Sequence, residues 1–452
     1  MKITLISPKG PLYRHRGGIF GKSLRYQPLT LTTLSALVPP ELGAEIALID
    51  ESIAEIPEAL DADLVGMTVI TGTAPRAYEL SKRLRAEGVT VVLGGPHVTL
   101  NPEEAAGEAD AIVVGYAEDS WPELLRDFAG GRMRPRYDQA ADFSLDRPLD
   151  QMVFPERDRF PRGKFLTQAV FEATRACAHA CDFCVSPAAW GRRQYQKPVA
   201  HVVEDIRRTG TSKALFVDLN LVSDRRYAEA LFTALVPLNI RWYGLATSLI
   251  GRDPALMELM ARSGCRGLLI GFETVAEAGL GAVRKGFNKP ALYAQLIADL
   301  HRLGIAVNGT FVFGGDADTE GTFRETTEFV LETGIDLPRF AVLTPFPGTP
   351  LFARLEAEGR IVTRDWELYD GQHVVFQPRG ISIRALELGH EAAWKRVYSW
   401  GAVARRTVRA GRQAPLALTS NLGYRFYAHN LARFYTCDWP EMAGAYAAGA
   451  AA

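Results

Sequence analysis

The amino-acid sequence predicts an α/β protein with two successive series of parallel strands and a mixed, mainly helical tail. Residues 1–130 alternate short apolar runs with amphipathic runs, which is typical of a doubly wound parallel sheet. A second alternation supplies six β/α units, fewer than the eight of a closed barrel. We therefore expect a doubly wound domain (1–130), a linker (131–165), a partial open barrel (166–350) and a C-terminal domain (351–452).

Each series is predicted from its apolar runs. In the first series the expected strands are 2–7, 45–50, 64–69, 89–95 and 111–115, and the expected helices are 29–38, 74–87, 102–106 and 119–129. Residues 64–69 (LVGMTV) are almost continuously apolar, as in a strand buried on both faces. Such sheets bind ligands at the carboxyl ends of their strands. This sequence places small and glycine-rich residues there, at 71–73, 94–97 and 115–118.

The second series begins after a segment (131–165) that is rich in Arg, Asp and Pro and has little periodicity, as in a linker. Its expected strands are 168–173, 213–218, 240–246, 266–271, 306–312 and 339–343. Its expected helices are 198–209, 225–236, 253–263, 290–303 and 319–333, and the tail has a helical stretch near 384–411.

Composition excludes several classes of protein. The 452 residues carry a formal net charge of -1, so no basic excess indicates a nucleic-acid partner. No apolar run reaches the roughly 18 residues that span a bilayer, and the N-terminal run is too short for a signal peptide. Five cysteines, three of them within eight residues, form a poor disulfide framework and suit a reducing compartment. We expect a cytoplasmic location.

Cys177, Cys181 and Cys184 directly follow the first predicted strand of the second series. Thiolates at this spacing can fold around one cubane and ligate three of its irons. His179 lies inside the run, but no second pair of ligands has a matching spacing. Three protein ligands leave one iron open to a substrate, so the spacing favours a 4Fe-4S cluster. A zinc site and three structural cysteines are the alternatives.

This motif, with Phe183 before its last cysteine and a six-unit β/α series around it, resembles the radical S-adenosylmethionine (SAM) superfamily over residues 168–350. The resemblance implies a TIM-like partial (β/α)6 barrel in which SAM chelates the open iron. It implies that one-electron reduction, by a donor such as flavodoxin or ferredoxin, cleaves SAM to a 5′-deoxyadenosyl radical. Cys177, Cys181 and Cys184 are then the catalytic and cluster-binding residues.

The same resemblance places SAM contacts at the ends of the later strands. Asp218 and Asn220 end the second strand, where the family commonly has Gly-Gly-Glu, and we expect them to hold the SAM amino group instead. Glu273, at the end of the fourth strand, is expected to accept the ribose hydroxyls. Lys285 is a weaker candidate, because lysines are usually solvated. The other expected SAM contacts are Phe183, Ser248, Gly309, Phe311, Thr344 and Pro345.

The first series lacks both GxGxxG after its first strand and GxxxxGK[ST], which disfavours dinucleotide and P-loop sites. Its stretches GGPHVT (94–99) and VVGYAED (113–119) resemble the Rossmann-like cobalamin-binding domain that precedes many radical SAM barrels. By that resemblance, threonines line the nucleotide tail and glycines admit the corrin. The expected cobalamin contacts are Pro8, Thr68, Thr71, Gly72, Thr73, Gly94, Gly95, Pro96, His97, Gly115, Tyr116 and Glu118.

Many cobalamin domains present a histidine beneath cobalt in the motif DxHxxG. His15 and Gly18 match its second half, but Tyr13 replaces the acid. We interpret this match as coincidental, and we expect His97 to be a wall residue and not a cobalt ligand.

Two tail segments, 366–376 and 421–425, resemble C-terminal parts of cobalamin-dependent radical SAM enzymes, which commonly cover the barrel mouth; simple core packing explains their aromatic residues equally well. The two modules together predict methylation of an unactivated carbon of a small-molecule or lipid substrate. The alternatives are a cobalamin-dependent cyclisation, oxidation or rearrangement, as in tetrapyrrole ring formation, and a cobalamin-binding sensor or carrier.

Overall fold

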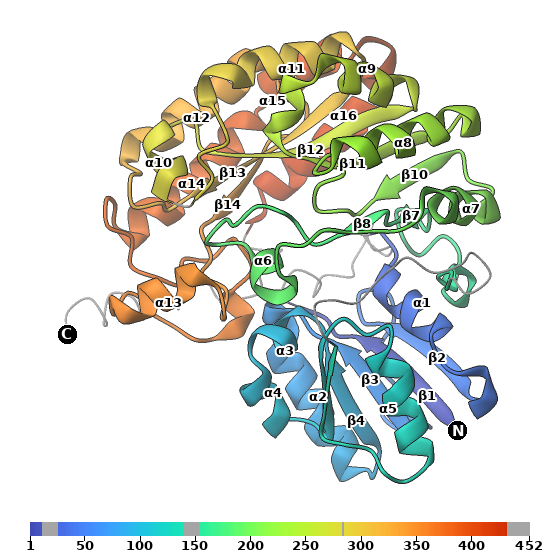
Figure 1. The fold of residues 1–452 in the computed structure, drawn as a ribbon. Helices are drawn as coiled ribbons and strands as arrows, with labels where there is room; N and C mark the ends of the chain where they lie inside the picture. The colour runs from blue at the N-terminus through green and yellow to red at the C-terminus, as the bar shows by residue number, and fades with distance from the viewer. Residues whose placement is uncertain (11–25, 140–152, 283, 432–452) are drawn as a thin grey trace.

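The computed structural model describes residues 1–10, 26–139, 153–282 and 284–431. Cys437 and the partial DxHxxG match around His15 lie outside these residues. The described chain forms two α/β units, one above the other in Figure 1, with the helical tail beside the upper unit.

The first unit is a six-stranded, all-parallel sheet with the order β2-β1-β3-β4-β5-β6. Its strands are β1 (Lys2–Ser7), β2 (Glu45–Asp50), β3 (Leu64–Thr68), β4 (Thr90–Gly94), β5 (Ala111–Gly115) and β6 (Arg136–Gln139). Its helices are α1 (Leu29–Ala36), α2 (Ala74–Ala86), α3 (Pro96–Leu100), α4 (Pro102–Gly107) and α5 (Ser120–Ala129). Apolar side chains of α2, α3 and α4 cover one face, and those of α1 and α5 cover the other. This is the expected doubly wound sheet.

Two elements of this unit were missed in the sequence. Strand β6 lies in the segment that we expected to be a linker, and it pairs in parallel with β5. Its sequence, RYDQ, buries only Tyr137 well, so it lacks the apolar run of a central strand. Helix α3 begins directly after Gly95, because Pro96 occupies the first helical turn, where a missing N–H costs nothing.

The second unit contains the expected open barrel of six parallel strands, in the order β14-β13-β12-β11-β10-β7. Its strands are β7 (Val170–Phe171), β10 (Lys213–Phe216), β11 (Arg241–Ala246), β12 (Cys265–Glu273), β13 (Ala306–Phe313) and β14 (Arg339–Val342). The crossover helices are α7 (Val199–Thr209), α8 (Arg225–Leu235), α9 (Pro254–Arg262), α11 (Tyr293–Arg302) and α12 (Glu320–Thr333). A short antiparallel pair, β8 (Thr174–Arg175) with β9 (Tyr195–Gln196), and helices α6 (Val185–Trp190) and α10 (Glu277–Ala282) complete the unit.

The tail has two parts with different positions. Helix α13 (Pro350–Ala357) and the chain up to residue 376 lie beside the cysteine loop, since the Leu351 N–H donates to the Asp182 carbonyl at 3.1 Å. Helices α14 (Ile383–Val397), α15 (Trp400–Arg409) and α16 (Ala414–Ala428) lie at the β14 side of the barrel. The rings of Trp394, Tyr398 and Tyr424 stack on one another there.

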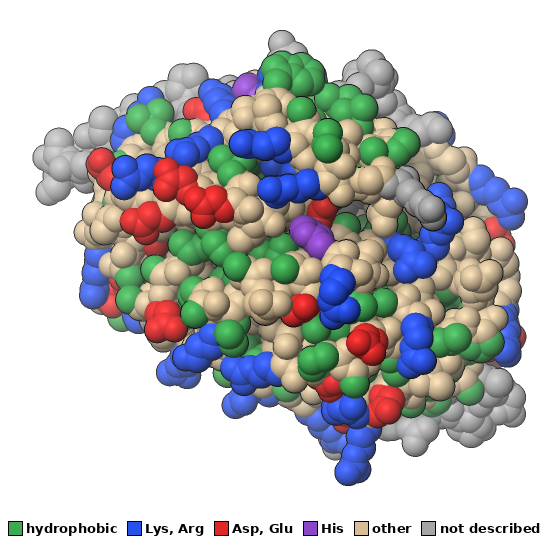
Figure 2. Space-filling view, turned by 90° about the horizontal axis from the view of Figure 1, so that it is seen from above, with side chains coloured by type: hydrophobic (Ala, Val, Ile, Leu, Met, Phe, Trp, Pro, Cys, Tyr) green, Lys and Arg blue, Asp and Glu red, His purple; other side chains and the backbone are tan. Residues whose placement is uncertain are grey.

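The helical stretch expected near 384–411 is therefore two helices, α14 and α15, with Tyr398 and Ser399 between them. Segment 421–425 lies within α16, and its Tyr424 packs against the barrel core. Among the described residues, no helix is long and apolar enough to cross a bilayer. Figure 2 shows the molecule from above, where hydrophobic, basic and acidic side chains are interspersed over the surface.

Candidate active site

The three cysteines occupy the loop between β8 and α6, at the carboxyl end of the barrel strands. Cys181 is buried, whereas Cys177 and Cys184 are half-buried, and the Cys184 N–H donates to the Cys181 carbonyl at 3.1 Å. Burial raises the pKa of the Cys181 thiol to about 11 and raises the pKa of Cys184, and the neighbouring thiols act in the same direction. Thiols in such a place stay protonated in the absence of a metal, and metal binding stabilises the thiolates and releases the protons.

This loop fits a cluster better than a single ion. In the part of the chain that the structure describes, no three His, Cys, Asp or Glu side chains lie close enough together to hold one metal ion. A cubane of four irons is held by a wider cradle, and thiolates are its usual ligands. His179 is directed elsewhere, because its ring stacks on Phe287 with 4.0 Å between centroids.

Asp218 supports the start of the cysteine loop from below. Its carboxylate accepts hydrogen bonds from the Ala173 N–H at 3.0 Å, from the Thr174 N–H, and from the Thr174 hydroxyl at 2.8 Å. The side chain is only 1% exposed, and burial raises its pKa to about 7. The oxygens of Asp218 thus fix the backbone that leads to Cys177, and its contact with SAM stays a prediction.

Asn220 is engaged in a similar way. Its side-chain amide donates to the Ser223 hydroxyl at 2.8 Å and accepts from the Val222 N–H at 3.3 Å, and it is 1% exposed. Asn220 thus stabilises its own turn, and like Asp218 it is buried.

A segment after α10 closes over the other side of the cysteine loop. Arg284 pairs with Asp182 at 3.2 Å, and Lys285 pairs with Glu273. Lys285 is 8% exposed, so the expectation that it is solvated is wrong. Glu273 has a φ of +65°, a left-handed conformation that is strained for a residue with a side chain. A Cβ at Gly271 would meet Glu273 Oε1 at 2.3 Å, so glycine there leaves room for the carboxylate.

The remaining predicted SAM residues divide into wall and core positions. Ser248 is half-buried and donates to Asn288 Oδ1 at 2.5 Å, and Phe183 is half-buried against the core near α13. Gly309 and Phe311 lie on the face of β13 that packs against α12: a Cβ on Gly309 would meet Ile335 at 2.9 Å, and Phe311 is fully buried against Phe329. The Thr344 hydroxyl donates to the Val342 carbonyl at 3.0 Å, next to Pro345.

A second site is a cavity of about 390 Å³ between the two units, within the usual range for small-molecule sites. Seven predicted cobalamin residues line it: Thr68, Gly94, Gly95, Pro96, Gly115, Tyr116 and Glu118. Its other walls are mostly apolar side chains from α1 and from the barrel, among them Leu34, Trp190 and Leu219.

Two features of the cavity fit a corrin. Gly95 and Gly115 have φ values of +105° and +82°, so these two positions require glycine and leave the strand ends bare. The Oε2 atom of Glu118 is buried without a hydrogen-bond partner. The amide groups around a corrin are donors that can satisfy such an oxygen.

The other five predicted cobalamin residues do not line this cavity, and Pro8 is buried away from it. Gly72 lies under the tail, since a Cβ there would be 3.8 Å from the Tyr369 carbonyl oxygen. Thr73 donates to the Ile70 carbonyl at 3.0 Å, and Thr71 contacts His97 Nδ1 at 3.3 Å. The cavity does not include these five residues, and the tail covers Gly72, so their contact with cobalamin stays a prediction.

His97 belongs to a buried polar cluster beneath that covering. Its Nε2 lies 3.2 Å from the Tyr78 hydroxyl and 3.4 Å from Glu104 Oε1. Trp366 of the tail donates to the same carboxylate of Glu104 at 3.0 Å, and its ring packs edge-on against His97. His97 is fully buried and does not line the cavity.

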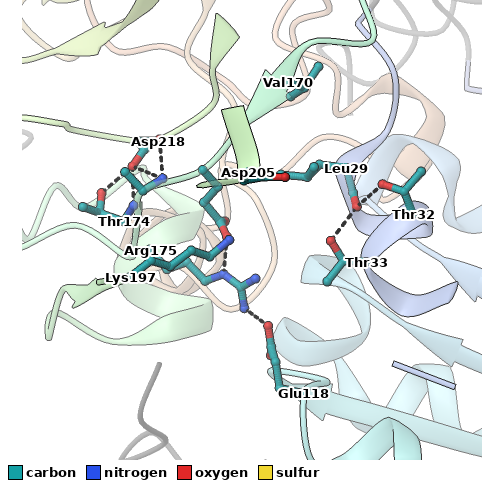
Figure 3. A network of polar contacts seen from close by, with 12 residues as sticks. Leu29, Thr32, Thr33, Glu118, Val170, Thr174, Arg175, Lys197, Asp205 and Asp218 are labelled. Carbon is teal, nitrogen blue, oxygen red and sulfur yellow. Dashed lines mark hydrogen bonds and ion pairs between the residues drawn. The ribbon is translucent and has the colours of Figure 1, made fainter. Parts of the chain in front are cut away.

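One ion-pair network crosses the boundary between the units. Figure 3 shows Glu118, at the end of the first sheet, pointing toward Arg175 of the barrel. Arg175 also pairs with Glu172 at 2.7 Å, and Lys197 reaches Glu172 at 3.0 Å. These cations hold the pKa of Glu172 down, to about 2, although burial opposes them.

Sequence reasoning missed the barrel side of the cavity. Arg175, Ala176 and Glu172 line it, and Ala176 is the residue before Cys177. Arg175 was visible as a cation beside the cysteine motif, but nothing in the sequence showed that Glu118 would be its partner.

Comparison with protein families matches residues 36–125 to the B12 binding domain and residues 171–330 to the radical SAM superfamily. Bacteriochlorophyllide d C-12(1)-methyltransferase of Chlorobaculum tepidum is 30% identical over 391 residues, which cover 84% of each chain. Bacteriochlorophyllide d C-8(2)-methyltransferase of the same organism is 31% identical over 408 residues, which cover 87% of this chain and 90% of that protein.

A solved structure shows the same fold. The radical SAM methyltransferase TsrM from Kitasatospora setae, solved with cobalamin and a 4Fe-4S cluster bound, aligns with a TM-score of 0.62 at 19% identity. The alignment covers 79% of this chain and 78% of that chain. It confirms the predicted combination of a cobalamin-type sheet and an open barrel.

Proposed function

Because this chain belongs to the family of radical SAM enzymes with a B12-binding domain, we propose that it methylates an unactivated carbon of a small-molecule or lipid substrate. One observation carries the proposal: the cavity and the cysteine loop share a wall. Ala176 lines the cavity and is bonded directly to Cys177. A methyl donor in the cavity and a radical source at the cysteines would therefore act on one substrate between them.

Each module supplies one part of the reaction. When bound, the cluster with SAM would supply radical chemistry at a substrate carbon, and cobalamin would supply the methyl group. Cys177, Cys181 and Cys184 would hold the cluster, and Asp218 fixes the backbone before them through Ala173 and Thr174.

The residues around the cysteine loop are proposed to receive SAM. Glu273 presents a carboxylate beside the loop and is balanced by Lys285, so a neutral ribose hydroxyl can bind without burying a net charge. Phe183, Ser248 and Thr344 remain candidate contacts from the surrounding strand ends.

The walls of the cavity bear on the substrate. Trp190, Val217 and Leu219 give the barrel side a largely apolar surface, which suits a flat or aliphatic substrate. The two relatives of highest identity given above are named for bacteriochlorophyllide, so chlorophyllides are the first compounds to test. Reduction of the cluster needs an outside electron donor, for which we propose a flavodoxin or ferredoxin. A reducing compartment such as the cytoplasm would keep the three thiols available.

The test uses the full chain, reconstituted anaerobically with iron, sulfide and cobalamin, and SAM labelled in its methyl group. With a chlorophyllide that the enzyme accepts as substrate, we expect labelled product, S-adenosylhomocysteine and 5′-deoxyadenosine. A product without an added methylene, formed together with 5′-deoxyadenosine, would indicate cyclisation or oxidation and not methyl transfer. Absence of 5′-deoxyadenosine in a preparation with intact cluster, tested with dithionite as reductant, would favour the sensor or carrier alternative.

A further inference from the structure

Six large apolar side chains are exposed on the outer side of α15 and α16. Trp400 is 64% exposed and Val408 81% exposed. The others all come from α16: Leu416, Leu418, Leu422 and Phe426. Exposed apolar residues scattered singly are ordinary, but six on two adjacent helices form a patch, and such patches mark interaction sites. We call these residues, with Arg405 and Arg409, the α15–α16 face.

The two helices present this face as one surface. The guanidinium of Arg425, near the end of α16, lies 4.2 Å from the ring centre of Trp400, at the start of α15. Arg406 points inward, where its Nε donates to Asn421 Oδ1 at 2.7 Å and its Nη2 to the Val397 carbonyl at 2.7 Å. The buried side chains thus face the barrel, and the apolar patch faces outward.

The face is also cationic in a chain that is nearly neutral. Residues 392–431 contain seven Lys and Arg and no Asp or Glu, whereas the whole chain has a net charge of -1. Arg405 and Arg409 are exposed, and among the described residues neither forms an ion pair with an acid. Lys395 and Arg396, at the end of α14, pair with acids outside this stretch.

We propose that the α15–α16 face docks onto an anionic lipid bilayer. Apolar side chains with Arg beside them on a helix surface match the two layers of a membrane interface, acyl chains and anionic headgroups. A nucleic acid would use the arginines but would leave Val408 and the leucines of α16 in water, so the observations favour the bilayer.

The experiment is flotation of the reconstituted full chain with vesicles of two compositions: phosphatidylcholine alone, and phosphatidylcholine with a quarter phosphatidylglycerol. We expect binding to the anionic vesicles that high salt weakens, and little binding to neutral ones. Arg405→Glu/Arg409→Glu should weaken binding by at least about tenfold. Val408→Ser/Leu416→Ser should weaken binding and leave the salt dependence in place.

The matched control is Lys82→Glu/Arg241→Glu, which makes the same change in net charge at two exposed cations on α2 and β11. It should bind anionic vesicles as the unmodified chain does. Absence of flotation with anionic vesicles would overturn the proposal, as would equal losses in the two charge-reversed variants. Tighter binding to single-stranded RNA than to vesicles, or a dimer that Val408→Ser/Leu416→Ser dissolves, would overturn it in favour of another occupant. Circular dichroism and cofactor content verify that each variant is folded.

Discussion

At the carboxyl end of the first sheet the side chains are small or absent, whereas at the carboxyl end of the barrel they are charged and paired. Thr68, Gly94 and Gly115 leave a cavity open between the units. The cysteine loop instead lies between two charged features. Asp218 binds the backbone that leads into the loop, and the ion pair of Lys285 with Glu273 lies on its other side. The cavity is an open space that can receive a large ligand. The cysteine loop is instead held in position by buried charged side chains, and its cysteines are the proposed ligands of the cluster.

The largest effect should come from the ligands of the loop. Cys181→Ala should reduce bound iron and sulfide and 5′-deoxyadenosine formation to background, since Cys265, the one described cysteine outside the loop, is buried in β12 and cannot replace it. Cobalamin binding should persist, because the cavity does not include Cys181. The control is Cys265→Ala, a buried cysteine of β12, which should keep the cluster. A Cys181→Ala protein with full iron and activity would contradict the assignment.

Removal of Arg175 should destabilise the boundary between the two sites. Arg175→Met leaves Glu118 buried without a cation and Glu172 with Lys197 alone. An uncompensated buried charge costs about 3–5 kcal/mol, measured as the free energy of unfolding of the cluster-free chain. Glu118→Gln/Arg175→Met should recover part of the loss.

Arg225→Met is the matched comparison, because Arg225 pairs with Glu229 and Asp253 at the surface, where solvent screens the charges, and its loss should change the free energy of unfolding much less. Equal losses for Arg175→Met and Arg225→Met would show that the boundary network has no special weight.

Filling the cavity should impair cobalamin binding without affecting the cluster. Gly94→Leu places a side chain in the cavity without backbone strain, since the nearest contact of its Cβ, with Val113, is an ordinary 3.6 Å. We expect cobalamin affinity to fall by about 10- to 100-fold, as for 1–3 kcal/mol of overpacking, with iron content unchanged. Titration of the corrin absorbance measures it. Gly107→Leu, with open space around its Cβ, should bind normally; unchanged affinity in Gly94→Leu would place the corrin elsewhere.

The smallest effect should be a pH dependence at Asp218. Its pKa of about 7 in the folded chain exceeds its ordinary value of 3.8. Between these pH values the folded chain keeps a proton that the unfolded chain has lost, so stability falls as pH rises from about 4 to 7. Asp218→Asn should remove about 1–3 kcal/mol of this pH-dependent loss in the free energy of unfolding, measured by urea unfolding at several pH values. Asp138→Asn, at an exposed site, should leave the slope unchanged; an unchanged slope in Asp218→Asn would contradict the account.

The two regions also differ in how far sequence predicts them. The apolar runs of β3 and β12 and the cysteine spacing are local signals, and they located the sheets and the loop. Strand β6 escaped because an edge strand such as RYDQ needs no apolar run. The sequence did not predict that Trp366 and Tyr369, far along the chain, lie over Gly72 and His97. The partner of Arg175 depends on how two units meet, which no local pattern records.

The most direct test of two cofactor sites in one chain is elemental analysis of the anaerobically reconstituted protein, with its visible spectrum. We predict four irons, four sulfides and one cobalt per chain, with the iron lost in Cys181→Ala and the cobalt content reduced in Gly94→Leu. Loss of both cofactors in both variants, or an iron-free chain that binds zinc at the three cysteines, would contradict it.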